Sequence, residues 1–286
     1  MKDLFMSYLY RLRHDITFKI TLIIGGGLVL FLTLIYLGLS FLSNINTVSG
    51  LTMFIASLSP SSNFGLVVPV NLITFTVLEF NHGSIRNKII AGHSKQKVYL
   101  SIFINGLVFT IALMTVYSLL SLGLGSFVGW LLSFNENLAP MDVLSNYTSD
   151  YLPKLIVIAL LSYISIVSFT IFFATLFRNI GPSIPVVLLV IVFLSTAASI
   201  VAIFLEDNEG LLWTFRIIDP MFALGAGEST VVGQTTVIIE GMEIIQDETK
   251  ATISTETFVS GIISNLVYTG LFFGGGLLIF SKRDIK

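Results

Sequence analysis

Two long apolar runs, separated by a short polar corner, decide the fold class. Residues 154–177 have the sequence KLIVIALLSYISIVSFTIFFATLF, and residues 183–205 have the sequence SIPVVLLVIVFLSTAASIVAIFL. Each run is long enough to cross a bilayer, which takes about 20 helical residues at a rise of about 1.5 Å each. Arg178 lies between the runs, and no charged residue falls near the middle of either one. We therefore interpret both runs as membrane-spanning helices.

The rest of the chain has the same character. Only 11% of the 286 residues are charged and 54% are hydrophobic, whereas an average soluble domain has about 25% charged residues. A soluble globule needs more charge on its surface, and a disordered chain needs low hydrophobicity. Barrel strands would alternate in polarity and be about 10 residues long. We therefore predict an all-α polytopic membrane protein, with residues 1–286 as a single transmembrane domain. The six predicted spans are about 20–42, 64–80, 98–121, 154–177, 183–205 and 258–280.

The second span is the shortest, because Pro60, Gly65 and Pro69 interrupt its outer end. Residues 51–58 are therefore a candidate for a separate short helix.

The distribution of charge predicts the orientation of these spans. Twelve of the 15 basic residues fall on one side of the six spans, which leaves a net charge of +8 on that side and −10 on the other. Positively charged segments stay in the cytoplasm. We therefore expect both termini in the cytoplasm, and a multi-pass protein of the plasma membrane of a bacterium. A net charge of −2 without a dominant basic stripe argues against a nucleic-acid partner.

Two further segments have recognisable patterns. In residues 1–18, polar residues recur at helical spacing from Asp3 to His14 and apolar residues cover the opposite face, which is typical of an interfacial helix that contacts membrane lipid. Residues 206–257 form the largest predicted extracellular segment. Its part at 235–257 is rich in Thr, Ile and Val around Glu240-Gly241, and we interpret it as a small β-hairpin.

Several kinds of chemistry have no support in the sequence. There is no G-x-x-x-x-G-K-[ST] phosphate loop, no H-E-x-x-H or G-x-S-x-G motif, and no cysteine. We therefore predict no catalytic residue, no metal site and no cofactor bound by this chain. An ion-driven carrier normally needs ionisable residues inside its spans, and only Glu79 comes close. Backbone sites for Na⁺ keep a stand-alone secondary transporter or channel open as an alternative.

One short cytoplasmic segment has strong signals for a helix of its own. Residues 79–95 have the sequence EFNHGSIRNKIIAGHSK. Gly83 can end the membrane helix, Ser84 can cap a new one, and Gly92 lies at a plausible C′ position. We therefore predict a short helix within residues 82–93, held under the membrane by the second and third spans.

The residue pattern of this short helix suits a docking role. Ile85 and Ile89 share one face, flanked by Arg86 and Lys88. Such a helix can fit a groove of a cytosolic partner. The alternative is a connector whose basic residues only satisfy the positive-inside rule.

The segment resembles the coupling-helix region of type-2 ABC transporter permeases. The resemblance lies in Glu79, the GSIR sequence at 83–86, Lys88, Gly92 and the Ser-Lys pair at 94–95. The amphipathic N-terminal segment, the six spans with both ends inside, the larger outer segment before the last span and the basic ending FSKRDIK at 280–286 are also similar to that family.

This resemblance implies partners. Two permease halves, identical or related, would pair with two copies of a cytosolic ABC ATPase subunit that binds ATP and Mg. Ile85, Arg86 and Ile89 would lie in the ATPase groove, and Glu79 would brace the loop, with His82 or a basic residue of the N-terminal helix as its partner. The ATPase-coupling residues implied in this way are Glu79, Gly83, Ser84, Ile85, Arg86, Lys88, Ile89 and Gly92.

Small and polar residues within the spans are the remaining candidates. Two glycine triplets lie at similar depth in the first and sixth spans, and they predict either close helix packing or a groove open to the inner leaflet. Three span asparagines, at 71, 105 and 265, either join helices or line a wet cavity. By resemblance, the substrate path follows the second and fifth spans. The triplets are Gly25, Gly26, Gly27 and Gly274, Gly275, Gly276, and the path candidates are Asn71, Thr74, Phe75, Phe193 and Ser195.

These observations predict a permease subunit of an ATP-driven exporter that has no catalytic activity of its own. The expected cargo is an amphipathic or hydrophobic substrate, with a small toxin-like or bacteriocin-like peptide as the first hypothesis. A lipid, a glycan or a drug is the alternative within the same class. A membrane enzyme is a third class, without a visible active-site constellation.

Overall fold

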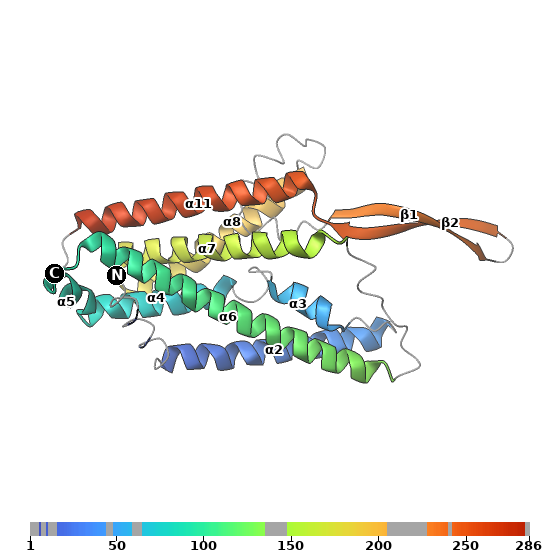
Figure 1. Cartoon of the computed structure of the whole chain (residues 1–286), viewed down its shortest axis with the longest axis horizontal. Coiled ribbons are helices and arrows are strands. Elements are labelled where there is room, and N and C mark those ends of the chain that lie inside the picture. Colours follow the sequence, from blue (N-terminus) through green and yellow to red (C-terminus); the bar gives the residue numbers. More distant parts are fainter. Residues whose placement is uncertain are drawn as a thin grey trace.

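Long apolar helices run side by side and give the molecule an elongated shape (Figure 1). The computed structural model describes residues 6, 10, 16–43, 48–58, 65–134, 148–204, 228–239 and 242–283. Most of the predicted interfacial helix at 1–18 lies outside the described residues, as do residue 205 of the predicted fifth span and residues 206–227 of the predicted outer segment. The described residues are helical apart from connecting turns and one two-stranded hairpin.

Four helices are long and apolar enough to cross a membrane, within the part of the chain that the structure describes. They make the chain a multi-pass membrane protein. Two further apolar segments, at 67–81 and 180–193, are shorter. The four long helices are α2 (Ile16–Ser43), α6 (Lys95–Leu132), α7 (Tyr151–Phe177) and α11 (Thr255–Lys282), and the shorter segments belong to α4 (Gly65–Asn81) and α8 (Ile180–Phe204).

The α6 helix is longer than the span predicted at 98–121. It continues to Leu132 and has 38 residues, which is about 57 Å of helix at about 1.5 Å per residue. The extension contains three glycines and therefore has a lower intrinsic helix propensity. A separate short helix, α3 (Gly50–Leu58), packs against it. Tertiary packing thus supports a segment that propensity alone does not favour, and α3 forms close to the range expected for it.

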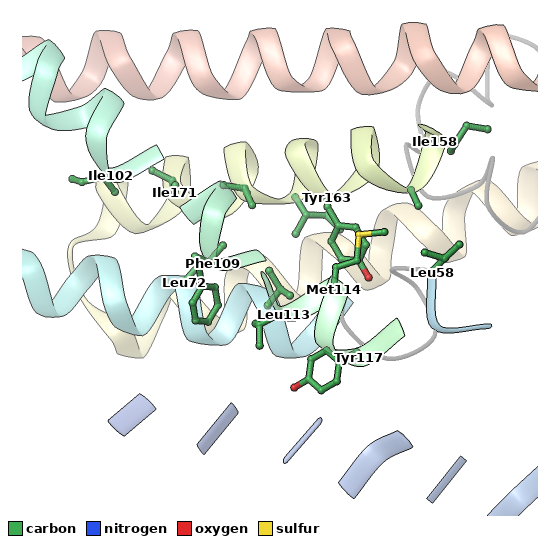
Figure 2. Close-up of a cluster of buried hydrophobic side chains, with 14 of the residues drawn as sticks. Leu58, Leu72, Ile102, Phe109, Leu113, Met114, Tyr117, Ile158, Tyr163 and Ile171 are labelled. Carbon is green, nitrogen blue, oxygen red and sulfur yellow. The ribbon is translucent and has the colours of Figure 1, made fainter. Parts of the chain in front are cut away.

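The buried core lies between α4, α6 and α7, with contributions from their neighbours. Aromatic and aliphatic side chains from these helices interlock in the middle of the bundle (Figure 2). The largest fully buried side chains include Tyr99, Tyr117 and Tyr163. The side chains of α2 face outward for much of its length, as expected for a helix in contact with lipid.

The hairpin projects from one end of the helices (Figure 1). Strands β1 (Glu228–Ile239) and β2 (Met242–Thr252) pair in antiparallel register, with Ile239 opposite Met242. The predicted turn at 240–241 lies between these strands, outside the described residues. Strand β1 begins at Glu228, whereas the sequence pattern predicted a hairpin that begins at residue 235. A shift in register between Val231 and Gly233 interrupts the ladder near its open end.

Candidate functional site

The candidate site is the short helix α5 (Ser84–Ile90), which lies at the opposite end of the bundle from the hairpin (Figure 1). Gly83 has a φ of 67°, a left-handed conformation that glycine adopts without steric cost. Its carbonyl accepts a hydrogen bond of 2.9 Å from the backbone N–H of Asn87. The N-cap is therefore Gly83 itself, without a side-chain hydrogen bond. Ser84 is the first helical residue and not the cap, which corrects the sequence-based expectation.

A second glycine ends α5. Gly92 follows the C-cap Ala91 and has a φ of 92°. Its N–H donates to the carbonyl of Ile89 at 3.0 Å, and the next N–H, of His93, donates to the carbonyl of Lys88 at 3.2 Å. This pair of bonds is a Schellman motif with glycine at C′. The chain then turns directly into α6, so α5 is held between two rigid connections.

A buried ion pair ties α5 to the end of α4. The Glu79 side chain is 1% exposed, and its Oε2 lies 2.8 Å from Nζ of Lys88. A carboxylate in such surroundings needs a paired cation, because an unpaired buried charge costs several kcal/mol. The family resemblance implied that Glu79 braces this loop through His82 or a basic residue of the N-terminal helix, whereas in the structure it pairs with Lys88.

The apolar face of α5 points into the bundle. Ile85 is 1% exposed within the main core cluster, and Ile89 is partly buried against the same cluster. Arg86 is exposed, and Ile90 is 72% exposed. The expectation that Ile85 lies in a partner's groove is therefore corrected: Ile85 is an anchor. Ile90, which the sequence-based assignment omitted, joins Arg86 on the outward surface. A helix of two turns carries isoleucines on both faces, and its own sequence does not indicate which one packs inward.

The glycine triplets each place one residue against a tyrosine of α6. A Cβ at Gly25 would meet the Tyr117 side chain, and a Cβ at Gly276 would meet the Tyr99 side chain. The Tyr117 hydroxyl donates to the carbonyl of Thr21 at 2.5 Å. Because the two tyrosines are 18 residues apart, or about five helical turns, they lie on one side of α6. These glycines let α2 and α11 approach α6 closely.

The other glycines of the triplets have different surroundings. Gly275 faces the ring of Phe172, at 3.3 Å from an added Cβ. An added Cβ at Gly26, Gly27 or Gly274 would meet no atom within 4 Å. Close packing therefore involves part of each triplet, and the remaining positions are open.

The substrate-path candidates do not share one environment: some are buried between helices and one is exposed. Asn71 accepts a hydrogen bond of 2.6 Å from the Thr21 hydroxyl of α2, and its amide nitrogen donates to the Val67 carbonyl at 2.8 Å. This arrangement joins α2 to α4. Phe193 is 64% exposed on α8. The Thr74 hydroxyl donates to the carbonyl of Val70, Phe75 packs against the main core cluster, and the side chain of Ser195 lies outside the described residues.

Polar side chains also join α7 to α11. The Ser165 hydroxyl lies 2.8 Å from Oδ1 of Asn265 and 3.2 Å from the Thr269 hydroxyl. At the hairpin end, Lys154 Nζ donates to the carbonyl of Ile253 at 2.8 Å and pairs with Asp150 at 2.6 Å. The span asparagine at 265 therefore joins helices.

A G-x-x-x-G motif of α6, absent from the sequence-based candidates, packs against the residues that lead into α3. An added Cβ at Gly125 would lie 2.7 Å from the Ser49 carbonyl oxygen, and one at Gly129 would lie 2.5 Å from the Val48 carbonyl oxygen. Glycines four residues apart share one face of a helix and allow close backbone approach. The spacing GSFVG at 125–129 was the signal that could have revealed this contact.

The contacts of α5 connect it to both of its neighbours in the sequence. Its groups fix a short helix firmly to α4 and α6 and leave a basic and an apolar side chain on the outside. Within the described residues, no group of three or more His, Asp or Glu side chains is placed to hold a metal ion. Comparison with protein-family models, curated proteins and solved structures finds no match to the chain.

Proposed function

We propose that the chain is the membrane-spanning permease half of an ATP-driven ABC exporter. In this proposal α5 docks on a separate cytosolic ATPase subunit, which binds ATP and Mg. The observation that carries the proposal is the construction of α5: two positive-φ glycines bracket it, Ile85 anchors it, and Arg86 and Ile90 remain exposed. A connector whose basic residues only satisfied the positive-inside rule would need neither the buried Ile85 nor the ion pair of Glu79 with Lys88.

The connections of α5 suit the transmission of force. A push on its exposed face passes to α4 through the pair of Lys88 with buried Glu79. It also passes to the beginning of α6 through the tight turn at Gly92. Because packed helices move as rigid elements, a small displacement of α5 shifts both membrane helices. Closure of an ATPase pair would provide such a displacement.

The proposed topology has six spans, with α4 and α8 as the second and fifth. The short apolar segments of α4 and α8 complete an even number of crossings with the four long helices. Both termini and α5 then lie in the cytoplasm, as the excess of basic residues on that side favours. A second permease half, identical or related, completes the transporter in the plasma membrane.

The proposed cargo is an amphipathic or hydrophobic molecule, with a small peptide as the first candidate. The support is compositional: the spans carry almost no ionisable groups, and the outward surfaces of α2, α8 and α11 are apolar. Lipids, glycans and drugs are substrates of the same class that a transport assay distinguishes.

The test uses the full chain reconstituted in liposomes with a candidate ABC ATPase subunit, identified by its Walker motifs in a neighbouring gene. The variants Arg86→Glu and Ile90→Asp change the exposed face of α5, and Lys97→Glu is the control, since Lys97 is an exposed cation in the next helix. We expect the two α5 variants to lose ATPase binding and coupled ATP hydrolysis while they insert into the membrane normally. Unimpaired ATPase binding and transport in the Arg86→Glu, Ile90→Asp double variant would sink the proposal.

A further inference from the structure

Three basic side chains gather at the end of the bundle that carries α5. Arg178 forms the corner between α7 and α8, where it has a φ of 53°. Its guanidinium carbon lies 5.1 Å from the centre of the Phe80 ring of α4. A non-glycine residue with positive φ is strained, and such strain persists where surrounding contacts hold the residue in place. Arg178 is therefore held in a defined position next to an aromatic ring.

The other two cations come from α11 and α6. Arg283 directly follows α11, is exposed, and donates from Nη1 to the Leu176 carbonyl at 2.6 Å. Lys95 Nζ lies 3.1 Å from the Arg283 carbonyl oxygen and 3.3 Å from the Ser281 carbonyl oxygen. Cations commonly satisfy the last carbonyls of helices in this way. This capping role explains part of the arrangement, at the ends of α7 and α11.

Capping leaves hydrogen-bonding capacity at this corner. A guanidinium has five N–H donors in a planar fork. Among the described residues, the Arg283 side chain donates one hydrogen bond, to the Leu176 carbonyl. Burial, and then the positive charge of Arg283, hold the pKa of Arg178 below its usual value. The geometry agrees, because Arg283 binds the carbonyl of Leu176, two residues before Arg178. An anion beside the two guanidiniums would offset their like charge and accept hydrogen bonds from the remaining N–H donors of Arg283.

The location indicates where the anion comes from. Phe177, the last residue of α7, is 37% exposed beside Arg178. The corner therefore lies at the end of a helix that is long and apolar enough to cross a membrane, next to an exposed apolar side chain. Phosphate is the anion present at that depth, and arginine recognises phosphate through paired N–H donors.

We propose that Arg178 and Arg283 form a binding site for the phosphate group of an anionic membrane lipid, with Lys95 as a supporting cation. The site lies at headgroup level on the α5 side of the bundle. It requires only that the chain spans the membrane, so it stands or falls independently of the ABC proposal.

The experiment titrates the purified full chain in a neutral detergent with short-chain phosphatidylglycerol, short-chain phosphatidylcholine or inorganic phosphate. Binding is followed by the rise in melting temperature, read from helical circular dichroism. We expect saturable stabilisation by phosphatidylglycerol only, and about a tenfold weaker apparent affinity in the Arg178→Gln, Arg283→Gln double variant, because charge-assisted hydrogen bonds are lost. Lys282→Gln, which removes an exposed cation next to the site, is the matched control and keeps the parental affinity.

Each other outcome overturns the assignment. Equal stabilisation by phosphatidylcholine would show that no anion is recognised. Equal stabilisation by inorganic phosphate would assign the site to a soluble anion instead of a lipid. Parental affinity in the double variant would remove both arginines from the site. If that variant does not fold, Arg283→Lys keeps the charge but loses the fork, and its affinity must still fall for the proposal to hold.

Discussion

Two of the three isoleucines of α5, Ile85 and Ile90, provide a sharp test of how this helix is held. Ile85 is 1% exposed and Ile90 is 72% exposed, although both belong to the same two-turn helix. Replacing a buried isoleucine with alanine costs about 2–5 kcal/mol, because apolar contacts are lost and a cavity remains. An exposed position usually changes stability by less than about 0.5 kcal/mol. We therefore expect Ile85→Ala to destabilise α5 and Ile90→Ala to leave its stability unchanged.

Hydrogen–deuterium exchange of the peptide that contains α5 measures this difference. A loss of about 3 kcal/mol raises the population of the locally open state about a hundredfold, and the exchange rate rises by the same factor. We expect that increase in Ile85→Ala and parental exchange in Ile90→Ala, with identical exchange of the hairpin peptide in both variants. Equal exchange of α5 in the two variants would refute the assignment of Ile85 as the anchor.

Further predictions concern helix packing and pH. Gly125→Ala should lower the melting temperature, with a cost of about 1–3 kcal/mol from overpacking against the Ser49 carbonyl and the Met53 side chain, whereas Gly123→Ala, which meets no atom within 4 Å, should not. Gly25→Ala should likewise destabilise the chain because its Cβ meets a tyrosine of α6, and Gly26→Ala should be neutral or stabilising, since alanine favours helix. Hydrogen bonding from the neighbouring lysine lowers the pKa of Asp150 from 3.8. The stability that ionised Asp150 contributes is therefore present above pH 3.8 and is lost as the pH falls through the lowered pKa. In Asp150→Asn, the melting temperature should depend less on pH in this acid range.

The sequence predicts those parts of the fold that depend on local composition. Apolar length locates the long helices, and the two glycines around α5 indicate where it begins and ends. Pro60 falls between α3 and α4 in the sequence, as the predicted interruption requires, whereas Gly65 begins α4 and Pro69 lies inside it. These features need no information about neighbours, because they follow from the hydrophobic effect and from backbone sterics.

Features that depend on tertiary packing were not predictable in the same way. The inward orientation of Ile85 depends on where the core lies, and the pairing of Glu79 with Lys88 depends on the angle of the turn at Gly83. The extension of α6 to Leu132 depends on the helix that packs against its glycines. For the same reason, the sequence did not indicate that Ile85 packs into the core and that Ile90 is exposed.

The corner at Arg178 illustrates a third limit. As a single basic residue between two predicted spans, it serves as a topology signal. Only the structure brings it next to Phe80 and near Arg283, which is more than one hundred residues away in the sequence. A cluster of cations from separate segments is invisible to local pattern analysis.

The composition of the complex purified from native membranes tests the central claim most directly. The measurement is the mass of the intact complex together with its ATPase activity. The account predicts two permease halves bound to two copies of a soluble ATP-hydrolysing subunit, and loss of those subunits in the Arg86→Glu, Ile90→Asp variant but not in Lys97→Glu. A chain that purifies without an ATPase, or a complex whose ATPase remains bound in that double variant, would contradict it.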